Sequence, residues 1–113
     1  MTDISPKRGE VWTVAGGKDY AGKPRPIVIL QSDAFNGDSV TFCGFTSNLT
    51  DAEIFRIPIV PSTANGLEKP SQIMIDKITT VSRSKLGKRI GKLEDSEMIR
   101  INRSIAVFVG LAD

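Results

Sequence analysis

The side chain best placed by its neighbours to do chemistry is Arg25, which stands between Pro24 and Pro26. Each proline fixes its own backbone and disfavours the helical conformation of the residue before it, so the chain around Arg25 is predicted to be extended. A guanidinium presented in this way can meet a phosphate with two hydrogen bonds, and it stays charged at any working pH. Arg25 is therefore a candidate anion site. The alternative is an arginine that only solvates the chain or pairs with a carboxylate.

Other residues restrict the chemistry that is available. The chain has one cysteine, Cys43, and no histidine, which excludes an internal disulfide and the usual zinc patterns and leaves any catalysis without imidazole. Cys43 lies in an apolar run and is predicted to be a buried hydrophobe rather than a nucleophile. The glycine-containing loop of residues 15–23 matches neither phosphate-binding glycine motif. We interpret this loop as a flap whose Lys18 and Lys23 can approach an acidic partner.

Composition indicates one globular domain over residues 1–113. The chain has no apolar run approaching the ~18 residues of a membrane span, and its first ten residues contain no apolar segment. No membrane attachment and a cytoplasmic location are therefore expected. The formal net charge of +2 permits nucleic-acid binding but does not by itself indicate it.

Short strands are predicted to position these side chains. Residues 27–30 form a continuous apolar run, Ile-Val-Ile-Leu, which is typical of a central strand buried on both faces. Further strands are predicted at 9–14, 40–45, 54–60, 71–75 and 78–82, with Pro58 placing its strand at an edge and Gly44 marking a bulge. The spacing of about ten residues, with turn signals such as Asn65-Gly66, predicts a small antiparallel barrel or sandwich.

One helix is predicted, over residues 95–109, and it should close the barrel. Met98, Ile101, Ile105 and Phe108 recur at steps of three and four residues and form one apolar stripe. Glu94 can occupy the cap position and Gly110 follows the end. The expected fold is mainly β with a C-terminal α-helix.

Several stretches, taken in order, resemble the MazF/PemK (Kid) family of toxin endoribonucleases. They are residues 8–12 (RGEVW), 22–26 (GKPRP) continuing to 31–33 (QSD) and 35–36 (FN), 45–48 (FTSN), and 66–71 (GLEKPS) continuing through 74–78 (MIDKI). Residues 90–91 (IG) to 110–111 (GL) fit the closing strand and helix of that family. The likeness covers nearly the whole chain.

The resemblance implies a small SH3-like β-barrel, of the type shared by CcdB, MazF and PemK, closed by a C-terminal helix and paired as a symmetric homodimer. It implies sequence-specific cleavage of single-stranded RNA, including mRNA, by attack of a 2′-hydroxyl, with no metal and no other cofactor. The products would be a 2′,3′-cyclic phosphate and a free 5′-hydroxyl. The implied partner is a cognate antitoxin whose extended acidic segment covers the RNA site, and toxin and antitoxin together are expected to bind DNA.

The resemblance also implies roles for three residues. Arg25 would bind the phosphate, and Thr46 would donate its hydroxyl to a phosphate oxygen, although a threonine at a strand end can instead bond its own backbone. Asp76 matches an acidic residue implicated in the Kid branch. It could be the base, or it could orient Arg25, because a carboxylate beside a guanidinium accepts a proton only weakly. The chain has Met74 where the Kid branch has an arginine, so the identity of the base stays open.

Further residues are candidates for RNA contact. Asp19 roughly matches a glutamate in the flap of some members, and Tyr20 could stack on an unpaired base. The alternative for each of them is a solvated surface side chain. The remaining candidates are Lys18, Lys23, Ser47, Asn48, Lys69 and Lys77.

Two other functions use related barrels. A CcdB-type gyrase poison is not an enzyme and would not require Arg25 and Thr46 in one pocket. An inactive relative would bind RNA or antitoxin without cutting. Only the nuclease would cut a long unstructured RNA in the presence of EDTA.

Overall fold

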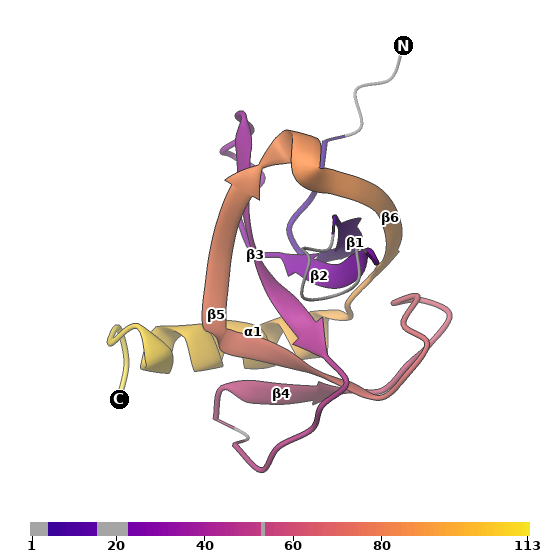
Figure 1. Ribbon diagram of the computed structural model, residues 1–113. Coiled ribbons are helices and arrows are strands. Elements are labelled where there is room, and N and C mark those ends of the chain that lie inside the picture. Colours follow the sequence, from indigo (N-terminus) through magenta and orange to yellow (C-terminus); the bar gives the residue numbers. More distant parts are fainter. Residues whose placement is uncertain (1–4, 16–22, 53) are drawn as a thin grey trace.

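The computed structural model describes residues 5–15, 23–52 and 54–113. Within these ranges, the elements follow the chain as six strands, one 3₁₀ turn and one α-helix (Figure 1). In order, they are β1 (Glu10–Val14), β2 (Arg25–Ile29), β3 (Ser39–Thr46), β4 (Arg56–Ile59), β5 (Ser71–Ser82), η2 (Arg83–Lys85), β6 (Leu86–Lys92) and α1 (Asp95–Phe108).

The six strands form one antiparallel sheet in the order β4-β5-β3-β2-β1-β6. The sheet is strongly curved, and α1 lies across its β4–β5 end (Figure 1). The predicted fold class, mainly β with a C-terminal helix, is confirmed. Among the described residues the strand pairing leaves β4 and β6 as edges, so the barrel is not closed by hydrogen bonds all the way round. Pro58 lies in β4, where an edge strand tolerates its missing N–H.

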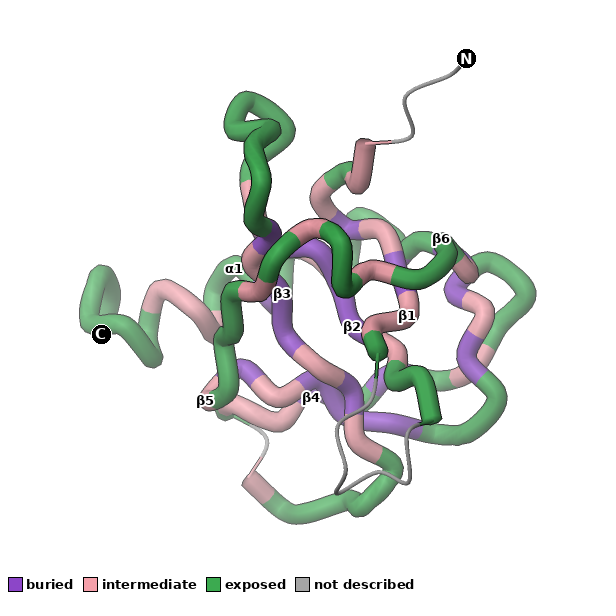
Figure 2. Tube along the Cα trace, turned by 45° about the horizontal axis from the view of Figure 1, so that its top comes forward, coloured by how far each residue is buried: buried purple, intermediate pink, exposed green. Residues whose placement is uncertain are grey.

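Strand β2 is central, as its apolar run predicts. Val28 packs into one cluster of buried side chains, while its neighbours Ile27 and Ile29 pack into a second cluster. Alternate residues of a strand face opposite sides, so the sheet is buried on both faces at this point. Figure 2 shows these buried stretches along the middle of the sheet, with much of the connecting loops and the C-terminal end of the helix exposed.

Strand β5 is one continuous element rather than the two strands predicted. Its twelve residues run through Asp76 and Lys77, where the sequence pattern suggested a break. The register with β3 shifts there, because Cys43 pairs with Ile78 whereas Phe45 pairs with Ile73. The predicted irregularity at Gly44 is confirmed, and β5 is irregular where it carries Asp76.

The helix begins and ends close to its predicted bounds. Glu94 and Glu97 form a reciprocal capping box, which satisfies two amide groups that no helical carbonyl can reach. Ile101 is fully buried, and Met98 and Ile105 pack against the same cluster. Phe108, the last member of the stripe, is 48% exposed, and its ring is tilted relative to that of Phe55, with the ring centroids 6.2 Å apart. No helix among the described residues is long and apolar enough to cross a membrane.

The first of the family-like stretches, residues 8–12, has a structural role. Arg8 donates through Nε to the carbonyl oxygen of Leu30 and through Nη2 to Asn102 of α1. Glu10 accepts the indole N–H of Trp12 and pairs with Arg89 of β6. These contacts tie the chain before β1 to the end of β2, to the helix and to the edge strand.

Candidate nucleic-acid interface

A groove of about 510 Å³ opens beside the start of β2. Five separate segments line it: β1, the entry to β2, the end of β3, the loop before β5, and β6. Its charged residues are four cations and one carboxylate, and its apolar lining includes Phe45, Leu67 and Ile90. The full lining consists of Thr13, Lys23, Pro24, Arg25, Pro26, Phe45, Ser47, Gly66, Leu67, Glu68, Lys69, Ser71, Lys88 and Ile90.

Arg25 lies at the boundary between this groove and a second cavity. It is the exposed first residue of β2, pairs with Val14 of β1, and borders both spaces together with Pro26 and Phe45. The second cavity, of about 240 Å³, is lined largely by apolar residues, with Lys77 and Thr79 from β5 among its polar ones. The residues of β2 that follow Pro26 are buried, and they hold the strand in place. The Cα atom of Arg25 therefore has a defined position between the two cavities.

Thr46 ends β3, and its side chain bonds locally. Its Oγ1 accepts the backbone N–H of Asn48 at 3.1 Å, the local bond that a strand-end threonine often makes. A hydroxyl that accepts one hydrogen bond still has its own proton to donate. Ser47, the next residue, lines the groove, whereas Thr46 itself is not among the lining residues.

The turn after Thr46 is held by a residue that the sequence analysis did not single out. Gln72 is the cross-strand partner of Thr46 and is only 5% exposed. Its Oε1 accepts the backbone N–H of Thr50 at 3.0 Å, and its Nε2 donates to the carbonyl oxygen of Thr50 at 2.7 Å. Gln72 therefore clamps Thr50 by both its backbone N–H and its carbonyl oxygen, and so holds the turn. No local pattern could have revealed a contact across 22 residues.

The loop before β5 forms a defined wall of the groove. Asn65 is 3% exposed, and its Oδ1 accepts the backbone N–H groups of Ser62 and Leu67 at 3.0 and 2.9 Å. Gly66 has a φ of +72°, and a side chain there would collide with the carbonyl oxygen of Ile90 in β6. The predicted Asn-Gly turn is thus confirmed, and the close approach of loop and strand fixes the residues that follow it.

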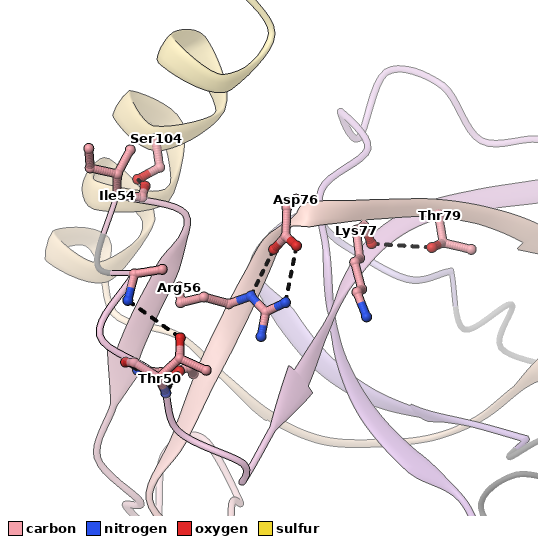
Figure 3. Close-up of polar contacts among 9 residues, drawn as sticks. Thr50, Ile54, Arg56, Asp76, Lys77, Thr79 and Ser104 are labelled. Carbon is pink, nitrogen blue, oxygen red and sulfur yellow. Dashed lines mark hydrogen bonds and ion pairs between the residues drawn. The ribbon is translucent and has the colours of Figure 1, made fainter.

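Asp76 forms a bidentate ion pair with Arg56 of β4 (Figure 3). Arg56 Nε donates to Oδ1 at 2.8 Å and Nη2 to Oδ2 at 3.0 Å, and the two side chains are 16% and 22% exposed. The hydrogen bonds from Arg56 hold the pKa of the Asp76 carboxyl below its usual value, and the same contact raises the pKa of Arg56. A carboxylate with both oxygens engaged and a lowered pKa is a weak base.

The remaining candidates divide by location. Lys23, Ser47 and Lys69 line the groove, and Lys77 lines the second cavity. Asn48 is exposed in the turn after β3. Lys18, Asp19 and Tyr20 lie outside the described residues.

Two charged residues of the groove were missed by the sequence analysis. Lys88 belongs to β6, whose sequence is rich in glycine and basic residues. Its apolar residues Leu86 and Ile90 are four positions apart, so the stretch lacks the close alternation that indicates a strand. Glu68 follows the Asn-Gly turn, and only the three-dimensional arrangement brings it to the same groove as Arg25.

Cys43 is fully buried in the sheet. Burial, with a smaller contribution from the charge of Asp76, raises the pKa of its thiol to about 12. The prediction of a buried hydrophobe is confirmed. Among residues 5–15, 23–52 and 54–113, no cluster of three or more His, Cys, Asp or Glu side chains is arranged to hold a metal ion.

Comparison with known proteins gives one consistent family. Residues 7–109 match the family described as PemK-like, MazF-like toxin of type II toxin-antitoxin system. A probable endoribonuclease MazF of Mycolicibacterium smegmatis is 47% identical over 107 residues, covering 94% of this chain and 98% of that protein. Endoribonuclease EndoA of Bacillus subtilis is 25% identical over 114 residues, covering 95% and 97%.

Solved structures agree on the fold. A mycobacterial endoribonuclease in complex with its cognate antitoxin has a TM-score of 0.81 at 22% identity, covering 96% of this chain and 99% of that one. A MazE–MazF complex from Deinococcus radiodurans has a TM-score of 0.79 at 17% identity, covering 97% and 100%. At such low identity these likenesses establish the architecture alone.

Proposed function

Since the chain belongs to the PemK-like, MazF-like family of toxins of type II toxin–antitoxin systems, we propose that it is an endoribonuclease that cuts single-stranded RNA at short sequence motifs. The relative at 47% identity is itself described as a probable endoribonuclease. The observation that carries the proposal is the groove that Arg25 lines together with Lys23, Lys69 and Lys88. Such a groove suits a polyanion whose bases are accessible.

The proposed reaction is an internal transfer at phosphorus that needs no metal ion. The 2′-oxygen of one nucleotide loses its proton to a base and forms a bond to the adjacent phosphorus. The bond from phosphorus to the 5′-oxygen of the next nucleotide breaks, and that oxygen takes up a proton. A 2′,3′-cyclic phosphate and a free 5′-hydroxyl remain.

Arg25 is assigned to the non-bridging phosphate oxygens, where negative charge increases as the new bond forms. A fixed guanidinium is most effective there because it needs no rearrangement at the moment of reaction. Thr46 is assigned as a second donor to the same phosphate, since its hydroxyl keeps a proton while accepting from Asn48. Its neighbours Ser47 and Asn48 are assigned to RNA binding.

Asp76 is assigned a positioning role with Arg56 in place of the role of base. Its two oxygens both accept from Arg56, and its lowered pKa opposes proton uptake. The pair joins β4 to β5 next to Lys77, which lines the second cavity with Arg25. Lys77 is assigned to RNA binding on that side.

The cations of the groove are assigned to the RNA backbone. Affinity should fall by about 0.7 log units per log unit of salt for each phosphate contacted. Lys18, Asp19 and Tyr20 remain proposals for RNA contact from the loop before β2. An affinity that does not change with salt would argue against this path for the RNA.

A cognate antitoxin and a second copy of the chain are the proposed partners in the cytoplasm. A segment with acidic residues among apolar ones could use the groove cations for steering and the apolar lining for retention, and would then compete with RNA. Binding of such a segment that left RNA cleavage unchanged would place its site elsewhere. Sedimentation at micromolar concentration should give about twice the chain mass of 12.3 kDa, and a single species at the chain mass would refute the dimer.

The proposed function is tested by incubating the purified protein with a long unstructured RNA in excess EDTA. Discrete cuts with cyclic-phosphate ends are expected. An intact RNA would favour the inactive relative, and an intact RNA together with trapped gyrase would favour the CcdB-type poison. The groove favours the nuclease, because a gyrase poison does not require Arg25 in a groove that three lysines also line.

A further inference from the structure

Glu68 is the one acidic residue among the described residues that line the groove. It shares that lining with four cations, Lys23, Arg25, Lys69 and Lys88. No ion pair or hydrogen bond joins its side chain to another described residue. The carboxylate oxygens of Glu68 therefore accept no hydrogen bond from a described residue, although the cations around them suit a polyanion.

A carboxylate cannot contact the phosphates of the RNA favourably, because both carry negative charge. It is an acceptor only, and its two oxygens can take two parallel hydrogen bonds. In unpaired RNA the partners available to it are the N–H groups on the Watson–Crick edges of the bases. The charge of Glu68 thus suits base recognition and opposes backbone binding.

The four bases differ in what they offer to two adjacent acceptors. Guanine presents two neighbouring donors, N1–H and the N2 amino group. Adenine and cytosine each present one amino group beside a ring acceptor, and uracil presents one N–H between two carbonyl oxygens. A carboxylate therefore favours guanine over the other three.

The surroundings of Glu68 are suited to holding a base. Asn65 fixes the preceding turn with two hydrogen bonds, and the contact of Gly66 with Ile90 fixes its distance from β6. Leu67 and Ile90 line the same groove and give part of its lining an apolar character. Because the backbone around Glu68 is already fixed, little conformational freedom is lost when a base binds. One side chain can then discriminate effectively between bases.

We propose that Glu68 is a specificity-determining residue that recognises a guanine in the RNA substrate through its N1–H and N2 amino groups. The proposal rests on the proposed function for the identity of the ligand as RNA. It concerns the recognition of one base in the groove and leaves the chemistry to the other residues.

Binding is measured first, with labelled seven-nucleotide 2′-O-methyl RNAs that cannot be cut because the attacking hydroxyl is blocked. All have uridine at six positions and guanine, inosine, adenine, cytosine or uracil at the central one. The parent should prefer guanine over uracil by about 5-fold to 150-fold, the range for one bidentate base contact. Inosine lacks the N2 amino group and should lose part of that preference.

Glu68→Gln should abolish the difference between guanine and inosine. Asp113→Asn is the matched control, because it makes the same change in net charge at an exposed C-terminal residue outside the groove lining. It should keep the preference of the parent. Equal binding of all five RNAs by the parent, or an unchanged preference in Glu68→Gln, would overturn the proposal.

Cleavage of a random unstructured RNA pool separates this inference from the proposed function. The cut sites of the parent should share a guanine at one fixed position, and Glu68→Gln should cut without that requirement. A parent that prefers guanine in binding but cuts nothing refutes the proposed function and leaves the inference intact. Loss of cleavage in Glu68→Gln by the same factor at every sequence would overturn the inference by assigning Glu68 to the chemistry.

Discussion

Breaking the Arg56–Asp76 pair should separate a positioning role for Asp76 from a role as base. The test uses Asp76→Asn, Arg56→Met and the double variant. The pair has two short hydrogen bonds between side chains that are 16% and 22% exposed. It should therefore contribute about 1–2 kcal/mol to the free energy of unfolding, above the range for fully exposed pairs. In a domain of this size that is a fall in Tm of roughly 4–10 °C.

The cleavage rates of the three variants distinguish a positioning role of Asp76 from a role as base. A general base typically contributes 100-fold to 10,000-fold to the rate. Loss of the contact between β4 and β5 would affect the rate only indirectly, through small shifts of the residues in the site. We expect kcat/KM to fall by less than about tenfold, and by similar factors in the two single variants and the double variant. A loss of more than about 100-fold in Asp76→Asn, with Arg56→Met close to the parent, would refute the positioning role and make Asp76 the base.

The pair also predicts a dependence of stability on pH. The folded-state pKa of Asp76 is lowered, so the stabilisation is complete above the ordinary carboxyl pKa and is lost as the pH falls through the lowered folded value. The difference in Tm between the parent and Arg56→Met should be constant from about pH 5 to pH 8 and shrink below about pH 4. A difference that grew on acidification would contradict the assignment.

Three further predictions concern the strands around the groove. Thr46→Val should lower the single-turnover rate about tenfold or more while the Kd for RNA changes little, and an unchanged rate would remove Thr46 from the chemistry. Gln72→Met removes two hydrogen bonds to Thr50 and should lower stability by about 1–3 kcal/mol, with faster hydrogen exchange confined to residues 46–52; equal acceleration throughout the chain would show that the clamp is not local. Cys43, with a pKa of about 12, should be thiolate in on the order of one molecule in 10,000 at pH 8 and should react with iodoacetamide only on unfolding, as measured by mass spectrometry. Rapid labelling of the folded protein would contradict its burial.

The elements with strong local signals were predictable from the sequence. β2 followed from its apolar run behind Pro24 and Pro26, and the helix followed from its stripe and from the Glu94 cap. The Asn65-Gly66 turn likewise depends on interactions within a few residues. In each case the residues that determine the structure are neighbours in the chain.

What could not be predicted depends on contacts between distant segments. Asp76 and Lys77 interrupt the apolar pattern of β5, so the pattern suggests two strands. The strand nevertheless continues through both residues, between a first part that pairs with β3 and β4 and a second part that pairs with β3. Arg56 as the partner of Asp76, and Gln72 as the clamp on Thr50, are each about twenty residues away in the chain. The groove combines five segments, which is why Lys88 and Glu68 were missed while Arg25 was found.

The measurement that tests the central claim most directly is the rate of RNA cleavage by Arg25→Ala in EDTA, beside the parent on the same unstructured RNA. Arg25 is exposed at the start of β2 and contributes to neither buried cluster, so the variant should keep a cooperative melt within a few degrees of the parent. Losing one preorganised donor at the phosphate should lower the rate by about 100-fold to 1,000-fold. A folded Arg25→Ala protein that cuts at more than about a tenth of the parent rate would contradict the account.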